Sequence, residues 1–137
     1  YFGKGDWAHA ISDYDEAIKI DPTMFQALNN RCMTKAVLGK DLDNAASDCD
    51  AAQALSPKDP FTILNRGLIE LKRGRFDRAI AQYDEALAID ARRARAYYGR
   101  GVAKLKTGDK SGGDADIAMA KAMLPNVAEE FANYGVR

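Results

Sequence analysis

Residues 73–90 read RGRFDRAIAQYDEALAID, and this stretch decides the fold. The apolar side chains from Phe76 to Leu87 recur at spacings of three and four residues, which places them on one face of an amphipathic helix. Gly74 precedes that helix and suits the left-handed conformation in which an earlier helix ends. Pro60 begins the earlier helix, at a position where a missing amide hydrogen costs nothing. This part of the chain is therefore predicted to form a helix, a turn and a second helix.

The same pattern recurs along the chain at intervals of 34 or 35 residues. Glycines at the turn follow this spacing at Gly5, Gly39, Gly74 and Gly108. Three further sets stay in step with them, namely Ala10, Ala45, Ala79 and Gly113, then Ala17, Ala52, Ala86 and Ala120, and last Pro22, Pro57, Ala91 and Pro125. A period near 34 residues is typical of a helix-turn-helix solenoid, in which each unit packs only on its neighbours.

The period divides the chain into four repeats and a cap. The predicted units are a partial repeat at 1–22, three repeats at 25–57, 60–90 and 94–124, and a capping helix at 126–135 that covers the apolar face of the last repeat. The first repeat keeps only its second helix, so we interpret the chain as part of a longer protein. Gly3-Lys4-Gly5 is interpreted as the helix stop before that second helix.

The turns and helix ends resemble those of the tetratricopeptide repeat family. Residues 4–11, KGDWAHAI, and 73–80, RGRFDRAI, are similar to the turn and opening of the second helix in that family, and DEALAID at 84–90 is similar to its end. The resemblance covers nearly the whole chain. It implies an all-α, right-handed superhelical solenoid with a C-terminal capping helix that works as a protein–protein interaction module.

The chain departs from the family pattern at two positions of the first helix. Arginine stands where the family usually has leucine, and Lys35, Glu70 and Lys104 stand where it often has tyrosine; the arginines are Arg31, Arg66 and Arg100. Arg66 and Glu70 are four residues apart, so we expect them to pair. Between these positions, Gly67 and Gly101 are expected to let two helices approach closely.

In the resembled family the first helices line a concave face that holds an extended peptide or a partner helix. The positions that this resemblance assigns to the groove are Asn29, Asn30, Met33, Leu64, Asn65, Leu68, Lys72, Arg95, Tyr98 and Lys106. An asparagine amide both donates and accepts, so it can bind a peptide backbone. The segment 60–110 carries 12 basic and 6 acidic residues. Basic side chains around an apolar floor favour a partner with apolar anchors and acidic residues.

Composition and motifs indicate neither catalysis nor a metal site. His9 is the only histidine and has no nucleophile near it in the sequence, so it is expected on the surface. The acidic run Asp13–Glu16 lacks the glycine and terminal glutamate of a calcium loop. We therefore predict no catalytic residue, no metal and no cofactor. The 20 basic and 20 acidic residues balance, which favours neither nucleic acid nor a membrane surface, and no apolar run approaches the ~20 residues of a membrane span.

The sequence leaves two other functions open, and the incomplete first repeat favours one of them. Without its first helix, Trp7, Ile11, Tyr14 and Ile18 would lack a cover, and exposed apolar patches usually mark contact sites. The alternative to a peptide groove is therefore a structural or self-assembly module that associates with other copies through its open N-terminal end. A targeting arm of a larger enzyme is the third interpretation.

Cys32 and Cys49 occupy facing positions on the two helices of the second repeat. We expect both to be buried and within contact distance. Free thiols that pack as small apolar side chains are the expected state. A bridge between them would instead indicate an oxidising compartment.

Overall fold

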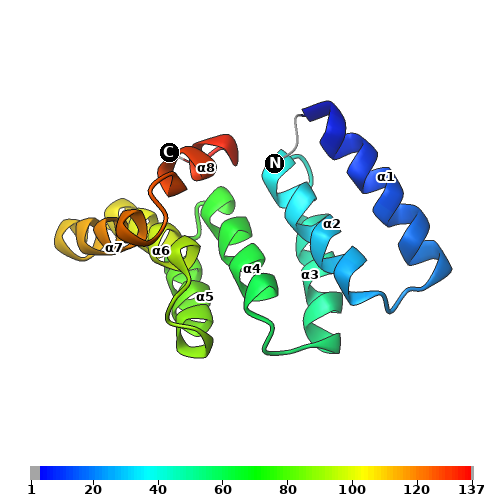
Figure 1. Cartoon of the computed structure of the whole chain (residues 1–137), viewed down its shortest axis with the longest axis horizontal. Helices are drawn as coiled ribbons and strands as arrows, with labels where there is room; N and C mark the ends of the chain where they lie inside the picture. The colour runs from blue at the N-terminus through cyan, green and yellow to red at the C-terminus, as the bar shows by residue number, and fades with distance from the viewer. Residues whose placement is uncertain (1–3, 137) are drawn as a thin grey trace.

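The computed structural model describes residues 4–136, and these residues form eight helices without a β-strand (Figure 1). The helices are α1 (Lys4–Ile20), α2 (Phe25–Leu38), α3 (Leu42–Leu55), α4 (Pro60–Arg73), α5 (Phe76–Ile89), α6 (Ala94–Lys106), α7 (Lys110–Met123) and α8 (Val127–Asn133). The predicted all-α class is confirmed. Gly3, the first residue of the interpreted helix stop Gly3-Lys4-Gly5, lies outside the described residues.

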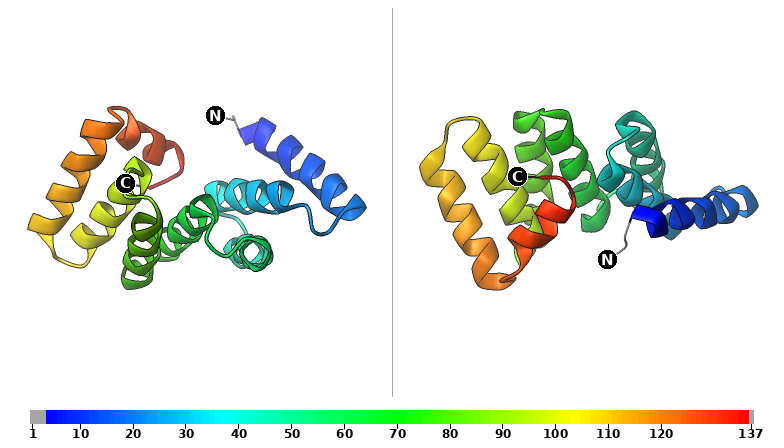
Figure 2. Two further views of the ribbon diagram at one scale, coloured as in Figure 1. Left: turned by 60° about the horizontal axis from the view of Figure 1, so that its bottom comes forward. Right: turned by 90° about the horizontal axis from the view of Figure 1, so that it is seen from above.

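Neighbouring helices pack as antiparallel pairs. The pairs α2–α3, α4–α5 and α6–α7 follow one another, and α1 packs on α2. The first helices α2, α4 and α6 also contact each other in sequence, which lines one side of the stack with them. Figures 1 and 2 show that the stack curves, so that α8 and the beginning of α1 lie on the same side of it.

Glycines in the left-handed conformation end α2 and α4, where the sequence predicts turns. Gly39 has φ 71° and Gly74 has φ 76°, a region that other residues rarely adopt. The helix stop predicted at Gly5 is wrong. Helix α1 begins at Lys4 and runs through Gly5, so no helix ends there among the described residues.

The side chain of Tyr83 fills a slot between two glycines. Its ring on α5 is 1% exposed and lies against Gly67 of α4 and Gly99 of α6. A Cβ atom at Gly67 would come within 2.7 Å of the ring, so only glycine fits there. Gly101 lies in the same way against α7, where a Cβ atom would stand 2.9 Å from the carbonyl oxygen of Gly113. The predicted roles of Gly67 and Gly101 are confirmed, whereas Gly99 was not foreseen.

The two cysteines form a disulfide, and the prediction that they are reduced is wrong. Both are fully buried, as expected, and their Cα atoms are 5.4 Å apart. This spacing is within the range of a disulfide, because α2 and α3 pack directly against each other. In the next repeat the facing positions hold Gly67 and Tyr83. The bridge therefore takes the place of a glycine–tyrosine contact.

The predicted opening at the N-terminal end is smaller than expected. Trp7 is only 8% exposed, and Ile11, Tyr14 and Ile18 are half-buried, because α1 packs along α2. The apolar side chain most exposed at this end is instead Ile20, at 82%.

Candidate functional site

A cleft of about 400 Å³ lies on the concave side of the stack (Figure 2), between its two ends. One wall comes from α1 and α2, and the other comes from α6, α8 and the residues flanking α8. The lining residues are Trp7, Met33, Thr34 and Val37 on the first wall, and Arg95, Asn126, Glu129, Glu130, Asn133 and Tyr134 on the second. Residues more than a hundred positions apart in the sequence thus share one cleft.

Helix α8 occupies the part of the predicted groove that α6 would offer. The ring of Phe131 packs on Tyr98, with 4.8 Å between the ring centroids. Arg95 donates hydrogen bonds to both carboxylate oxygens of Glu130. Two residues assigned to ligand binding, Arg95 and Tyr98, therefore already have partners within the chain.

Lys72 also has partners within the chain. Its Nζ donates 2.7 Å hydrogen bonds to the carbonyl oxygens of Val37 and Tyr134. Burial lowers the pKa of this ammonium group. The side chain thereby joins the end of α2, the end of α4 and the segment that follows α8.

The pairing of Arg95 leaves the cleft acidic. Burial acts to raise the pKa of Glu130, but hydrogen bonds from Arg95 and from the hydroxyl of Tyr134 outweigh it and hold that pKa below its usual value. Glu130 is therefore ionised and neutralises Arg95. Glu129 is exposed and is the remaining charged residue of the cleft lining. This balance is opposite to the basic groove that the sequence suggests.

Two predicted asparagines hold the repeats together. Asn29 accepts hydrogen bonds at Oδ1 from Thr62, at 3.1 Å, and from Nδ2 of Asn65, at 2.9 Å. Both asparagines are buried, so α2 and α4 are joined by a polar contact. Asn30 is exposed, and its carbonyl oxygen accepts from the hydroxyl of Thr34.

The cleft contains only some of the predicted groove residues. Of these, Met33 and Arg95 line it. Leu64 and Leu68 are buried in the core, and Lys72 and Lys106 line a smaller hollow of about 250 Å³ near the C-terminal ends of α4 and α6. Thr34, Val37 and the polar face of α8 also line the cleft but were not predicted from the sequence. Trp7, which the sequence predicts at an open end, lines the cleft instead, and tryptophan is a common binding residue.

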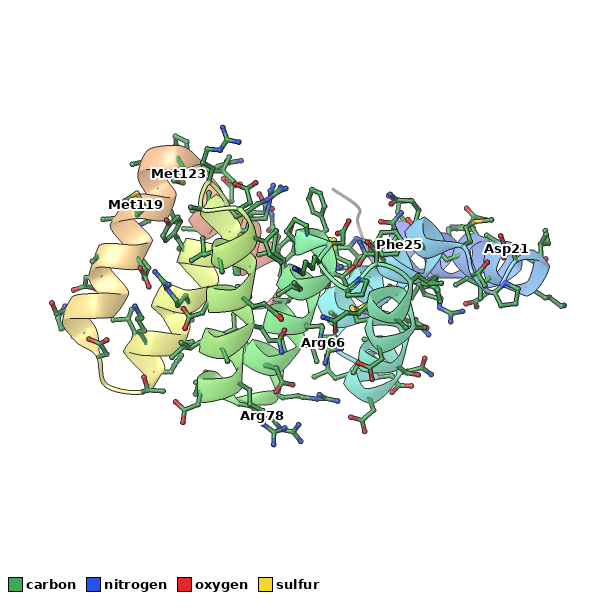
Figure 3. The ribbon with its side chains drawn as sticks, turned by 90° about the horizontal axis from the view of Figure 1, so that it is seen from below. Asp21, Phe25, Arg66, Arg78, Met119 and Met123 are labelled. Atoms are coloured by element: carbon green, nitrogen blue, oxygen red, sulfur yellow. A yellow bond between two sulfur atoms is a disulfide. The ribbon has the colours of Figure 1, made fainter. Side chains whose placement is uncertain are left out.

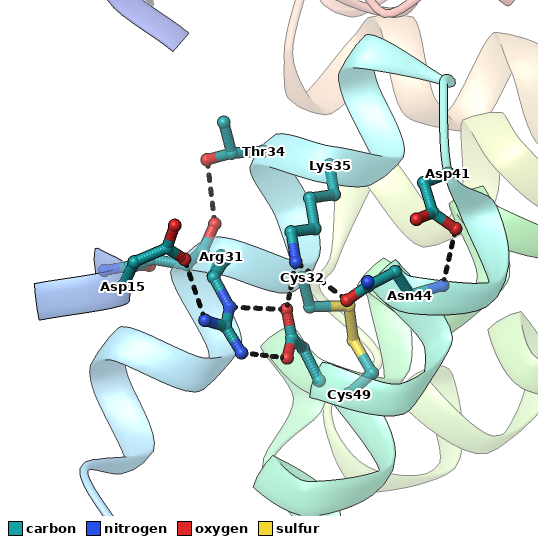
Figure 4. Close-up of polar contacts among 10 residues, drawn as sticks. Asp15, Arg31, Cys32, Thr34, Lys35, Asp41, Asn44 and Cys49 are labelled. Atoms are coloured by element: carbon teal, nitrogen blue, oxygen red, sulfur yellow. Dashed lines mark hydrogen bonds and ion pairs between the residues drawn. A yellow bond between two sulfur atoms is a disulfide. The ribbon is translucent and has the colours of Figure 1, made fainter. Parts of the chain in front are cut away.

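A ladder of arginines runs along the first helices. Arg31 donates two hydrogen bonds to Asp48, at 2.8 Å from Nε and 2.6 Å from Nη2, and a third to Asp15 (Figure 4). Lys35 lies 3.4 Å from the same Asp48 carboxylate. One guanidinium group thus joins three successive helices, α1, α2 and α3.

The same arrangement recurs in α6 but changes in α4. Arg100 donates twice to Asp116 and once to Asp84. In α4, Arg66 pairs with Asp50 alone. The predicted pair between Arg66 and Glu70 is wrong. Glu70 pairs instead with Arg73, three residues further along α4, at 3.0 Å.

The described residues show no other kind of site. No group of three or more histidine, cysteine or acidic side chains among residues 4–136 is arranged to hold a metal ion. None of the helices described is both long enough and apolar enough to cross a bilayer.

Comparison with known proteins gives matches to one repeat family. A family model described as TPR repeat matches residues 67–108. Stress-induced-phosphoprotein 1 of Caenorhabditis elegans is 30% identical over 92 residues, and Photosystem I assembly protein Ycf3 of Synechococcus sp. (strain CC9902) is 35% identical over 85 residues. The matches cover 66% and 60% of this chain but only 28% and 49% of these relatives. The chain thus spans less than half the length of either relative.

Solved structures match over nearly the whole chain. A crystal structure of MamA has a TM-score of 0.75 at 20% identity and covers 96% of this chain and 77% of its own. MamA 41-end from Desulfovibrio magneticus RS-1 has a TM-score of 0.76 at 16% identity, with coverage of 89% and 68%. At these sequence identities the structural similarity shows the fold alone. Repeats of this kind act as scaffolds for protein–protein interaction. The repeat period, the stacked helix pairs and these matches together show a solenoid of tetratricopeptide-type repeats, with the TPR repeat model matched at residues 67–108.

Proposed function

We propose that the chain binds a short segment of a partner protein in the cleft between α2 and α8. The observation that carries this proposal is the pairing of an apolar wall, Trp7, Met33 and Val37, with a polar wall from α8 across about 400 Å³. Such a volume is at the lower end of ligand sites and takes about one or two large side chains. The bound segment therefore inserts an anchor residue and does not follow the whole groove.

The charges of the cleft favour a basic residue next to that anchor in the bound segment. Arg95 is neutralised by Glu130, and Lys72 lies outside the cleft lining, with its ammonium group donating to backbone oxygens. Glu129 is exposed at the rim. A rim charge mainly steers association, whereas the buried anchor holds the complex. The proposed segment carries a long apolar side chain with a lysine or arginine beside it.

Selection from a random peptide library tests this proposal. Selected peptides should share an aromatic or long aliphatic residue with a basic neighbour. Their binding can be followed by the fluorescence of Trp7, the only tryptophan of the chain. Met33→Ala should weaken binding about tenfold, because the anchor loses part of its contact surface. Glu129→Gln should weaken the basic peptides about threefold and reduce their salt dependence.

A matched control is available on α7. Met119 is exposed and lies outside the cleft lining, so Met119→Ala should leave affinity unchanged. Equal affinities of the selected peptides for Met33→Ala and Met119→Ala would overturn the proposal.

Association of copies through the N-terminal end is the second candidate. It is favoured by Ile20, which is 82% exposed, and by Met24 beside it. Sedimentation of the chain should then show a dimer that Ile20→Glu dissociates. A monomer at every concentration tested would exclude this candidate and leave the cleft proposal intact.

A further inference from the structure

One arginine of the ladder lacks the carboxylate that its equivalents have. Arg31 and Arg100 each donate two hydrogen bonds to an aspartate on the following helix, Asp48 and Asp116 respectively. Gln82 stands at the equivalent position of α5, one residue before Tyr83. Arg66 consequently has no second partner among the described residues besides Asp50.

Arg66 and Gln82 line a cleft of about 420 Å³ between α3, α4 and α5. Arginine side chains dominate its lining, which consists of Ala46, Asp50, Arg66, Ile69, Glu70, Arg73, Arg75, Arg78, Ala81 and Gln82. Figure 3 views the molecule from the side on which Arg66 and Arg78 lie. The cleft shares no lining residue with the one beside α8 and is separate from it.

The acidic residues of this cleft do not neutralise it. Glu70 pairs with Arg73, and Asp50 pairs with Arg66. The side chains of Arg75 and Arg78 are exposed and make no ion pair within the described part of the chain. Two cations are therefore left over, in the most basic segment of the sequence.

Gln82 adds an unused acceptor. Its Oε1 is buried and receives no hydrogen bond from the described residues. A buried acceptor without a donor costs free energy, and Gln82 does not give Arg66 the carboxylate that Asp48 and Asp116 give to its equivalents. The cleft thus offers donors for a carboxylate.

We propose that this cleft binds an acidic segment of a partner protein. One carboxylate of the segment takes the two free donors of Arg66, where Asp48 and Asp116 stand in the neighbouring repeats, and flanking acidic residues pair with Arg75 and Arg78. Bidentate arginine–carboxylate pairs are among the stronger polar contacts, and the neighbouring repeats supply their geometry. A protein segment fits better than a small anion, because the cations spread over two helices and a turn.

The decisive variant is Gln82→Asp, which supplies the missing carboxylate from within the chain. The probe is a fluorescent, end-capped peptide of six glutamates, followed by anisotropy, with the equivalent peptide of six glutamines as its control. The wild-type chain should bind the glutamate peptide only. Gln82→Asp should weaken this binding about tenfold, because the introduced aspartate occupies Arg66. Gln26→Asp makes the same charge change at an exposed site on α2 and should alter affinity less than about twofold.

A second variant and a competitor complete the test. Arg75→Gln/Arg78→Gln changes exposed, unpaired side chains, so it should fold normally and also weaken the peptide about tenfold. Inorganic phosphate at the peptide's concentration should displace little of it. Equal affinity of Gln82→Asp and Gln26→Asp would overturn the proposal, as would full displacement of the peptide by equimolar phosphate, which would indicate a site for small anions.

Discussion

Lys72 and Tyr134 are 62 residues apart, and a 2.7 Å hydrogen bond from the Nζ of Lys72 to the carbonyl oxygen of Tyr134 joins them. The same ammonium donates to Val37, also at 2.7 Å. One half-buried cation therefore connects the C-terminal segment to the middle of the stack. The wall that α8 contributes to the binding cleft depends on this connection as well as on the contact between Phe131 and Tyr98.

Replacing Lys72 by methionine should loosen the C-terminal segment. The variant keeps the apolar stem but leaves the carbonyl groups of Val37 and Tyr134 without their donor. Hydrogen exchange of the amides from Tyr134 to Val136 should become about tenfold faster, whereas α4 and α5 should stay protected. Lys121→Met, on the exposed face of α7, is the control and should change neither. Unaltered exchange in Lys72→Met would mean that the contacts of Phe131 and Glu130 hold α8 without Lys72.

Replacing Tyr83 by phenylalanine should not destabilise the chain. The hydroxyl is buried and has no hydrogen-bond partner among the described residues, while the ring fills the slot between Gly67 and Gly99. Removing an unsatisfied buried hydroxyl is expected to raise the free energy of unfolding by about 1 kcal/mol. Gly99→Ala should lower it by about 1–3 kcal/mol through overpacking against the ring. Both changes are measurable by urea denaturation, and a large loss in Tyr83→Phe would reveal an unseen hydrogen bond.

Tyr83 should also limit stability at alkaline pH. Burial raises its pKa far above the 10.0 of an exposed tyrosine. The unfolded chain releases the phenolic proton above pH 10 and the folded chain does not. The contribution of this titration to the free energy of unfolding is therefore fully present below pH 10 and is lost as pH rises further. The slope of unfolding free energy against pH should therefore be less negative above pH 10 in Tyr83→Phe. Parallel curves for the two proteins would contradict the burial of the hydroxyl.

The disulfide between Cys32 and Cys49 should stabilise the second repeat. Thiol titration of the unfolded, unreduced chain should find no free thiol. The bridge joins residues 17 apart, and closing a loop of this length is worth about 3 kcal/mol. Dithiothreitol should lower the free energy of unfolding by about that amount, with no effect on a Cys32→Ala/Cys49→Ala variant. Two free thiols in the unreduced chain would restore the expectation drawn from the sequence.

Asp116→Asn should destabilise the last helix pair. Burial acts to raise the pKa of Asp116, but hydrogen bonds from Arg100 and Lys104 outweigh it and keep this pKa below the usual value. Its stabilising effect is present above pH 3.8 and is lost as pH falls through the lower folded pKa. At pH 7 the variant should lose about 1–3 kcal/mol, since two cations lose their shared partner. Asp114→Asn, which breaks the exposed pair with Lys110, should cost much less, because solvent screens the charges of an exposed pair.

The repeating pattern of the sequence was sufficient to predict the helices. Small residues, glycines and prolines recur every 34 or 35 residues, and helix ends depend on local chemistry that such residues carry. Gly39 and Gly74 accordingly adopt the left-handed conformation at predicted turns. Gly5 instead lies within α1.

The candidate site was harder to predict, because it depends on which side chains already have partners. Arg95, Lys72 and Asn65 have the right chemistry for a ligand, yet each binds another part of the chain. The pairing of Arg95 with Glu130 joins residues 35 apart. No local sequence pattern predicts such a pair, because each side chain by itself resembles an ordinary exposed charge.

The sequence by itself therefore determined the repeat, the all-α class and the close contacts at Gly67 and Gly101, because each follows from spacing and side-chain size within about one repeat. The tertiary structure alone decided that α8 forms a wall of the cleft, that the cysteines are bridged, and that Arg66 lacks the partner that Arg31 and Arg100 have. These features depend on distances between side chains of different helices, and such distances are set by the packing and curvature of the whole stack.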